Sequence, residues 1–179
     1  MIYLFLAEGF EEIEALCPLD LLRRAGLSVT TVGVGAKQIT GAHGITVQAD
    51  VLDTEYTDPS PEMVILPGGM PGTLNLAESE VVQNAIETAH EKGAYLAAIC
   101  AAPSILGDMG LLVGKEAVCF PGFEEHLTGA TLSSCRVVRD GKIITAAGMG
   151  VALEFGLTLV AALCGEDQAE ALRRAVLAD

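Results

Sequence analysis

Basic side chains are scarce in this chain of 179 residues. It has 10 Lys and Arg against 24 Asp and Glu, which gives a formal net charge of −14. A field of that sign repels phosphate backbones and anionic membrane surfaces. The densest basic segments are the pairs Arg23-Arg24 and Arg173-Arg174. We therefore expect neither a nucleic acid nor a membrane as a partner.

The chain also lacks the cysteine spacings of metal sites and disulfide frameworks. It contains five cysteines, an odd number, and no C-x-x-C pattern: Cys17, Cys100, Cys119, Cys135 and Cys164. This usage argues against a cysteine zinc site and against a set of structural disulfides. A reducing compartment is the simplest setting, so we expect a cytoplasmic protein.

Long apolar runs and cofactor motifs are missing as well. The most apolar stretch, 143–165, is interrupted by Glu154 and several glycines, and neither charge-free half could span a bilayer. The N-terminal apolar segment has no basic residues before it and meets Glu8 at once, as in a strand rather than a signal peptide. No phosphate loop, dinucleotide fingerprint or metal-binding histidine pair occurs. We expect no cofactor and no metal.

What the chain has is an alternation of short apolar runs and helical patterns. The apolar fraction of 51% and the length fit one globular domain, 1–179. Strands are predicted at 2–7, 28–34, 63–66 and 95–99, with an edge strand at 45–51 and a hairpin at 137–145. Helices are predicted at 11–25, with a kink at Pro18, and at 81–92, from 101 onward, 151–163 and 166–177. This order predicts an α/β fold: a mostly parallel sheet with helices on both faces.

Functional sites in such folds lie at the carboxyl ends of the strands, and Cys100 occupies one of these ends. An apolar strand runs into Cys100, and small residues follow that can begin a helix. Free backbone N–H groups and a helix dipole at such a junction stabilise a thiolate and lower the thiol pKa. The small neighbours also permit a strained nucleophile elbow. The alternative is that Cys100 is an ordinary small buried side chain.

Gly68 and Gly69 follow another predicted buried strand. A glycine pair lets the backbone approach a ligand and direct N–H groups at an oxyanion. The alternative is an ordinary turn after a strand. Next to a nucleophile at a neighbouring strand end, the pair predicts an oxyanion hole.

An acidic segment opens the first predicted helix, and Glu14 is its third glutamate. A carboxyl at this edge of the sheet could exchange a proton with a thiol. The alternative, which we prefer for Glu11 and Glu12, is that the acids stabilise the helix N-terminus. The three histidines, His43, His90 and His126, lie in segments that favour solvated positions, with His126 a remote candidate for a base.

Three segments together resemble the ThiJ/PfpI superfamily, and within it the Parkinsonism-associated deglycase branch and its bacterial relatives. They are the stretch 6–14 with Gly9 and its acids, the Leu66-Pro67-Gly68-Gly69 segment, and the Ala97 to Pro103 segment around Cys100. The resemblance extends over essentially the whole chain. It implies a flavodoxin-like three-layer sandwich, a homodimer, and no cofactor.

The same resemblance assigns roles to individual residues. It implies that Cys100 is the reactive cysteine, that Glu14 is a protonated carboxyl bound to its sulfur, and that Gly69 and Ala101 supply backbone N–H groups. Eukaryotic members often have a histidine where this chain has Phe120, so no Cys–His dyad is expected and proton transfer would fall to Glu14. His43 lies near the place of an arginine that crosses the dimer in those members.

Three functions are compatible with these residues. The leading hypothesis is a cofactor-independent enzyme for α-oxoaldehydes such as methylglyoxal, or for early glycated products, with Cys100 as nucleophile. The second is a redox sensor or stress chaperone that uses the same oxidisable thiol. The third is a structural or regulatory protein with a degenerate site.

Overall fold

The fold is built on one seven-stranded sheet. In the computed structural model, which describes residues 1–178, its strand order is β10-β11-β7-β6-β1-β2-β5. Every neighbouring pair in it is parallel except β10 and β11, which form the predicted hairpin. The prediction of a mostly parallel α/β sheet is confirmed.

The strands follow the apolar runs closely. The sheet strands are β1 (Ile2–Leu6), β2 (Val29–Gly33), β5 (Val51–Leu52), β6 (Met63–Leu66), β7 (Tyr95–Ile99), β10 (Val137–Asp140) and β11 (Ile143–Ala146). All residues of β6 and β7 are buried, because both sides of the sheet centre are covered by helices.

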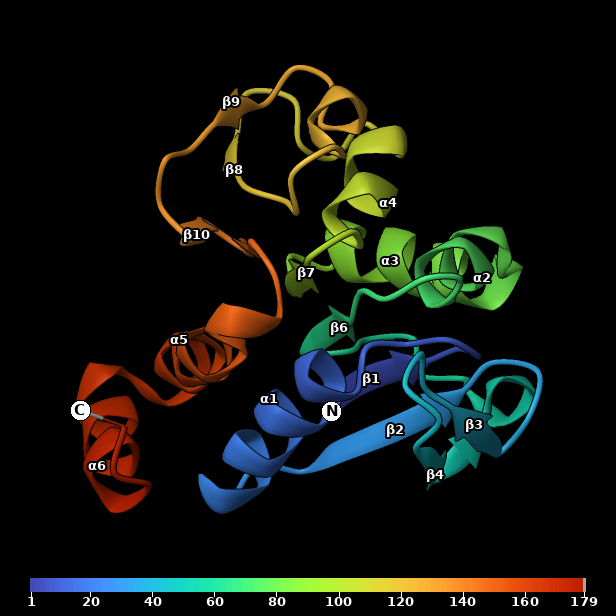
Figure 1. The fold of residues 1–179 in the computed structure, drawn as a ribbon, viewed down its shortest axis with the longest axis horizontal. Coiled ribbons are helices and arrows are strands. Elements are labelled where there is room, and N and C mark those ends of the chain that lie inside the picture. The colour runs from blue at the N-terminus through green and yellow to red at the C-terminus, as the bar shows by residue number, and fades with distance from the viewer. Residues whose placement is uncertain (179) are drawn as a thin grey trace.

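The helices form two layers around this sheet. They are α1 (Glu12–Arg24), α2 (Gly72–Glu78), α3 (Glu80–Glu91), α4 (Pro103–Asp108), α5 (Ala152–Cys164) and α6 (Glu166–Ala175). α1, α5 and α6 lie on one side of the sheet, and α2, α3 and α4 lie on the other (Figure 1). Each layer buries its own apolar cluster against the sheet. The three-layer sandwich is therefore confirmed.

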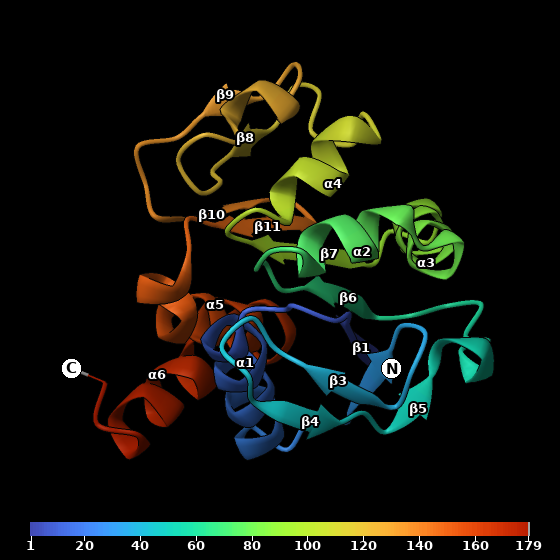
Figure 2. The same cartoon turned by 45° about the vertical axis from the view of Figure 1, so that its right-hand side comes forward.

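Two small sheets stand outside the main one (Figure 2). β3 (Gln38–Thr40) pairs with β4 (Thr46–Gln48), and β8 (Glu116–Ala117) pairs with β9 (Thr131–Leu132). The predicted edge strand 45–51 was wrong as one element. Its first part belongs to the β3–β4 hairpin, and its end leads into β5, which is the edge of the main sheet.

Three short 3-10 turns complete the described elements: Asp53–Glu55, Glu124–His126 and Met149–Val151. α1 includes Pro18, as predicted, on a buried face, and the kink at this residue stays a prediction. The helices α1 and α5 reach 13 residues each. Within residues 1–178, no helix combines the length and the apolar character needed to cross a membrane.

Candidate active site

Cys100 lies in a turn directly after β7, at the carboxyl edge of the sheet. Its backbone is left-handed, with a φ of 66°. For a side chain with a Cβ this conformation costs about 1–2 kcal/mol. Two backbone hydrogen bonds hold it in place: its N–H donates to Ala146 O at 2.9 Å, and its carbonyl accepts from Phe120 N at 2.8 Å. The predicted strained elbow is present.

α4 begins at Pro103, two residues after the predicted start, and ends at Asp108. A contribution of its dipole to the thiol stays a prediction. The groups that face the sulfur are individual backbone amides rather than the end of a long helix.

Glu14 reaches the same edge from the first turn of α1. Its residue is 0% exposed. Its Oε2 accepts a hydrogen bond from Gly68 N at 3.0 Å. Its Oε1 is buried and has no hydrogen-bond partner among residues 1–178. A carboxyl that is buried and only half satisfied is costly unless it is protonated or faces a reacting group.

Gly68 is the point where the thiol and the carboxyl face each other. An ideal Cβ at Gly68 would lie 2.6 Å from Cys100 Cβ and 2.6 Å from Glu14 Oε2. No real Cβ tolerates such contacts. Glycine is therefore required here because the two reactive side chains converge over its Cα, which brings Cys100 and Glu14 together as the sequence predicted.

The backbone N–H groups of this edge are divided between sulfur and carboxyl. Those of Ala101 and Gly69 interact with Cys100 and lower its pKa. That of Gly68 is occupied by Glu14 Oε2. The prediction that Gly68 belongs to the oxyanion hole was therefore wrong: its donor holds the carboxyl in position, and Gly69 and Ala101 remain to face the sulfur.

The two ionisable groups share one proton over a broad pH range. Burial raises the pKa of Glu14 to about 7. Burial, followed by the charge of Glu14, raises the pKa of Cys100 to about 12. The expectation of a lowered thiol pKa was wrong because desolvation and a neighbouring carboxylate outweigh two amides. Above about pH 7 the pair keeps a single proton, which sulfur and oxygen can exchange.

Phe120 forms an apolar wall beside this pair. An ideal Cβ at Gly148 would lie 3.1 Å from the Phe120 ring and 3.9 Å from Glu14 Oε1, so ring and carboxyl border the same glycine. Phe120 is 39% exposed. A group that cannot carry a proton thus stands next to the carboxyl, and no imidazole assists Glu14 from this position.

The other acids of the segment have structural surroundings of their own. Glu12 Oε1 accepts hydrogen bonds from His43 N at 2.8 Å and Ile45 N at 3.3 Å. Burial works against ionisation of Glu12, yet these bonds lower its pKa overall. The hydrogen bond to Glu12, together with the charge of Glu11, raises the pKa of His43. Glu12 therefore holds the 41–45 loop rather than only the helix N-terminus.

The remaining sequence candidates lie apart from Cys100. His126 contacts the Asp108 carboxylate at 3.0 Å and 3.1 Å on the surface. His90 is exposed on α3. Cys119 is buried near Glu124, whose charge adds to the effect of burial and raises its pKa to about 11. None of these residues has a contact with the Cys100 and Glu14 pair among the hydrogen bonds and ion pairs of residues 1–178.

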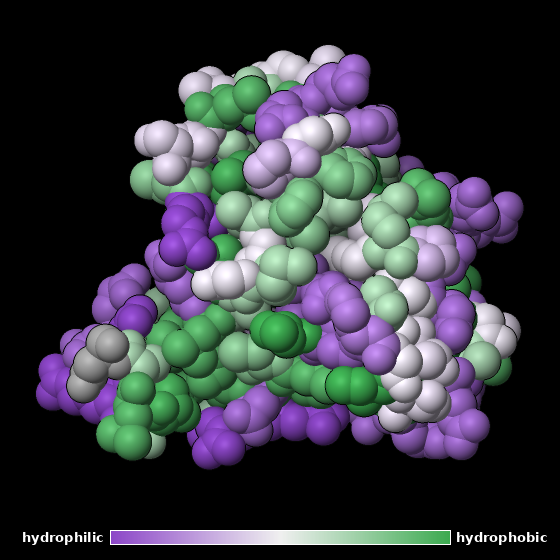
Figure 3. All heavy atoms as spheres, viewed as in Figure 1, coloured by the Kyte–Doolittle hydropathy of each residue, from purple (hydrophilic) through white to green (hydrophobic). Residues whose placement is uncertain are grey.

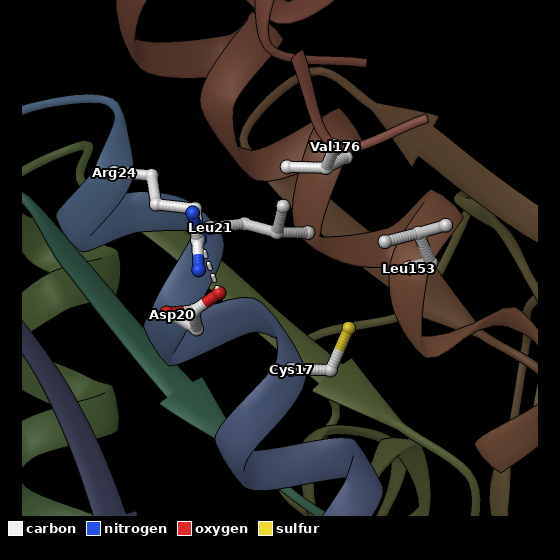
Figure 4. A pocket seen from close by; sticks show the side chains of 6 residues that line it. All are labelled: Cys17, Asp20, Leu21, Arg24, Leu153 and Val176. Carbon is white, nitrogen blue, oxygen red and sulfur yellow. Dashed lines mark hydrogen bonds and ion pairs between the residues drawn. The ribbon is translucent and has the colours of Figure 1, made fainter. Parts of the chain in front are cut away.

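A separate hollow of about 270 Å³ lies between α1 and α5. Cys17, Leu21 and Leu153 line it, and the Cys17 sulfur points into the gap between the helices (Figure 4). It opens on an apolar face where green side chains gather over α1 and α5 (Figure 3). Ile13 on α1, Leu153 on α5 and Met149 in the turn before α5 are exposed apolar residues. The hollow contains neither Cys100 nor Glu14.

Sequence reasoning missed the segment between β11 and α5. Ala146 O anchors the Cys100 N–H, and Gly148 borders both Phe120 and Glu14. The run Ala146-Ala147-Gly148 follows a strand at the same edge of the sheet as Gly68 and Cys100. Small residues after a third strand were the signal that could have identified it.

Comparisons with known proteins identify relatives of this chain. The chain is 40% identical over 166 residues to "Protein DJ-1 homolog B" of Arabidopsis thaliana, covering 91% of the chain and 38% of that protein. It spans about two fifths of the length of the two Arabidopsis proteins that it matches. It is 32% identical over 167 residues to "Glutathione-independent glyoxalase DJR-1.2" of Caenorhabditis elegans, covering 92% of the chain and 89% of that protein.

A solved structure extends the likeness to three dimensions. "Toxoplasma gondii DJ-1, oxidized" superposes with a TM-score of 0.91 and 32% identity, over 98% of this chain and 97% of that one. The model of the DJ-1/PfpI family matches residues 1–162, which include the strand edge with Glu14, Gly68 and Cys100. The chain belongs to the DJ-1/PfpI family.

Proposed function

We propose that this protein is a cofactor-independent enzyme that converts α-oxoaldehydes such as methylglyoxal to 2-hydroxy acids, with Cys100 as nucleophile. The observation that carries the proposal is the buried Glu14 carboxyl, whose Oε1 lacks a hydrogen-bond partner within residues 1–178 while Oε2 is fixed by Gly68 beside Cys100. A related protein with the name of a glutathione-independent glyoxalase supports the same chemistry.

The first step is addition of sulfur to the aldehyde. The single proton of the pair moves to Glu14, and the Cys100 thiolate attacks the aldehyde carbon to form a C–S bond. The carbonyl oxygen takes up the electron pair and is stabilised by the N–H groups of Gly69 and Ala101. Glu14 then protonates this oxygen, which gives a hemithioacetal and leaves the carboxylate ionised.

The carboxylate next acts as a base. Glu14 removes the proton from the former aldehyde carbon and delivers it to the neighbouring ketone carbon through an enediol, while the proton of the hemithioacetal hydroxyl passes to the former ketone oxygen. One carbon is thereby oxidised and the other reduced. The product is a thioester of a 2-hydroxy acid. Water hydrolyses it, which frees the thiol. The overall reaction consumes one oxoaldehyde and one water and needs no external oxidant or reductant.

A glyoxalase assay without glutathione tests the proposal. Wild type and Cys119→Ala, the matched variant at the other buried thiol, are expected to convert methylglyoxal to lactate. Cys100→Ala is expected to lose at least about 10³-fold in kcat, because no other group supplies the nucleophile. Equal turnover by wild type and Cys100→Ala would refute the assignment. Turnover of a glycated amine in place of methylglyoxal would favour the related deglycase reaction.

A second candidate function is redox sensing or a stress-chaperone role. It is favoured by the likeness to a DJ-1 structure whose title describes it as oxidized. A sulfinate at Cys100 could accept hydrogen bonds from Gly69 and Ala101 and receive one from protonated Glu14. Mass spectrometry after mild peroxide treatment tests this role: two oxygens added selectively at Cys100 support it. Oxidation of the exposed Cys135 and Cys164 to similar extents, with Cys100 unchanged, would count against it.

A homodimer formed through α1 belongs to the same proposal. Ile13 is 53% exposed and Leu153 is 40% exposed on the face that surrounds the hollow beside Cys17. Burial of such side chains between two copies would gain hydrophobic free energy. Sedimentation of wild type and Ile13→Glu tests the contact: a dimer that the charge converts to a monomer is expected, and a monomeric wild type would exclude it.

A further inference from the structure

Three side chains with metal-binding atoms converge outside the Cys100 and Glu14 pair. Glu11 and Glu12 stand at the start of α1, and His43 lies in the loop that joins β3 to β4. One ligand atom from each lies within 4.8 Å of the other two. The cluster thus joins a helix start and a hairpin loop that are distant in sequence.

The two carboxylates of this cluster are removed from solvent. Glu11 is 7% exposed and Glu12 is 5% exposed. Neither forms an ion pair with a lysine or arginine among residues 1–178, and the cationic partner of both there is His43, whose Nδ1 lies 3.4 Å from Glu11 Oε2 and 3.0 Å from Glu12 Oε2. Two adjacent buried carboxylates in a chain with a net charge of −14 carry a large desolvation and repulsion cost. A bound cation would offset that cost.

Glu11 is the member whose carboxylate is left available. Its backbone N–H is fixed by Gly68 O at 2.9 Å. No hydrogen bond reaches its side chain within the described residues, where its polar neighbour is His43 Nδ1 at 3.4 Å. A carboxylate more than nine-tenths buried and directed at two other donor atoms is an unusual arrangement unless something else completes it.

Glu12 presents one carboxylate oxygen to the cluster. Its Oε1 accepts from His43 N and Ile45 N, which fixes the plane of the carboxylate. Its Oε2 is hydrogen-bonded to His43 Nδ1 at 3.0 Å, and a bound ion would take the place of the proton in this contact. Backbone donors that orient a carboxylate in this way act as the supporting shell of metal sites in general.

The spacing of the donor atoms fits a small divalent ion. Zn²⁺ binds carboxylate oxygen and imidazole nitrogen at about 2.0–2.2 Å. Adjacent ligands at that radius are separated by about 3.0 Å at right angles and about 3.4 Å at the tetrahedral angle. The distances from His43 Nδ1 to Glu12 Oε2 and Glu11 Oε2 are 3.0 Å and 3.4 Å.

We propose that Glu11, Glu12 and His43 form a binding site for a divalent transition-metal ion, of which Zn²⁺ is the representative example. A mixed set of imidazole and carboxylate ligands suits ions of this class better than Mg²⁺ or Ca²⁺, which prefer oxygen alone. His43 lies on the exposed side of the cluster, so the outer coordination positions are open to water or a small ligand. The site uses no thiol and does not depend on the chemistry proposed for Cys100.

The experiment is a titration of the full chain with Co²⁺, followed by absorption, and with Zn²⁺, followed by calorimetry. Wild type is expected to bind one ion per chain with oxygen and nitrogen ligation, visible as weak visible bands without a sulfur-to-cobalt band. Glu11→Gln and His43→Ala are each expected to raise the Kd by at least about tenfold. His43 is exposed, so its variant leaves the folded core intact.

Two variants serve as controls. His126→Ala removes an imidazole that also contacts a carboxylate, Asp108, but lies on the surface without a second acidic residue. Cys100→Ala removes the sulfur of the neighbouring site. Both are expected to bind the ion as wild type does. Absence of saturable binding, unchanged binding in His43→Ala, or a sulfur-to-cobalt band that disappears in Cys100→Ala would overturn the proposal.

Discussion

Cys100 and Cys119 are both buried thiols that follow strands, and burial raises the pKa of each, to about 12 and about 11 respectively. Their surroundings differ in three ways. Cys100 has a buried acid beside it, two amides on its sulfur and a left-handed backbone. Cys119 has one amide and the charge of a surface glutamate, Glu124.

The comparison shows that burial does not activate a thiol, because desolvation raises its pKa at both positions. Cys100 differs from Cys119 because a neighbouring group can accept the proton that its thiol loses. Glu14 has a pKa raised to about 7 and can hold that proton near neutral pH, whereas nothing comparable adjoins Cys119. Each of the following experiments separates one part of this difference.

The largest effect is expected from removal of the acid beside Cys100. Glu14→Gln keeps the shape of the side chain but cannot exchange a proton, so turnover should fall by about 10²-fold or more. In wild type the rate should rise with pH up to about 7, as the pair loses its first proton. This limb should disappear in Glu14→Gln, as a pH–rate profile would record.

Glu124→Gln is the matched control, because it removes the acid near Cys119 and leaves Gly122 a hydrogen-bond partner. It should change neither the rate nor its pH dependence. A limb near pH 7 that survives in Glu14→Gln would show that another group holds the proton, and the distinction between the two thiols would then lose its basis.

A smaller effect is expected on stability. The pKa of Glu14 is raised in the folded protein to about 7 from 4.5. Below about pH 4.5 the group is protonated in both states, and between 4.5 and about 7 only the unfolded state ionises freely. The folded state should therefore lose about 3 kcal/mol of stability from this group as the pH rises through that range.

Denaturant unfolding at pH 5 and pH 8 measures this difference. The loss between the two pH values should be greater in wild type than in Glu14→Gln, and Glu124→Gln should behave as wild type does. The ionisation of His43 is common to all three proteins and cancels in the comparison. Equal pH dependence in wild type and Glu14→Gln would mean that the carboxyl is no harder to ionise in the folded protein.

The sheet could be predicted from the sequence because its signal is local. The runs at 63–66 and 95–99 coincide with β6 and β7, since apolar runs bounded by glycine or proline determine strand length. α2 was missed because a short helix of seven residues that begins beside Pro71 carries little periodicity. The 45–51 segment was misassigned because pairing with β3 is decided by a neighbouring strand, not by its own pattern.

The residues of the site could be predicted from the sequence, but the directions of their pKa shifts could not. Small residues and glycines mark Gly68 and Cys100 within the sequence, the acidic segment makes Glu14 a candidate, and the family resemblance assigns it to the sulfur. The hydrogen bond from Gly68 to Glu14 joins residues 54 positions apart, so the sequence could not assign that donor. The sign of the thiol pKa shift depends on burial, which is a property of the packed chain. That the whole chain forms one domain stays a prediction.

The smallest expected effect concerns the backbone at the two thiols. Cys100 has a φ of 66°, whereas Cys119 is not among the described residues with a positive φ. Cys100→Gly and Cys100→Ala both remove the sulfur, but only glycine accepts a left-handed backbone without a penalty, so Cys100→Gly should be the more stable by about 1 kcal/mol. At Cys119 the order should be reversed, because glycine gains more freedom on unfolding and buries no methyl group. Paired unfolding curves of the four variants measure both differences, and the same order at both positions would show that the elbow at Cys100 stores no strain.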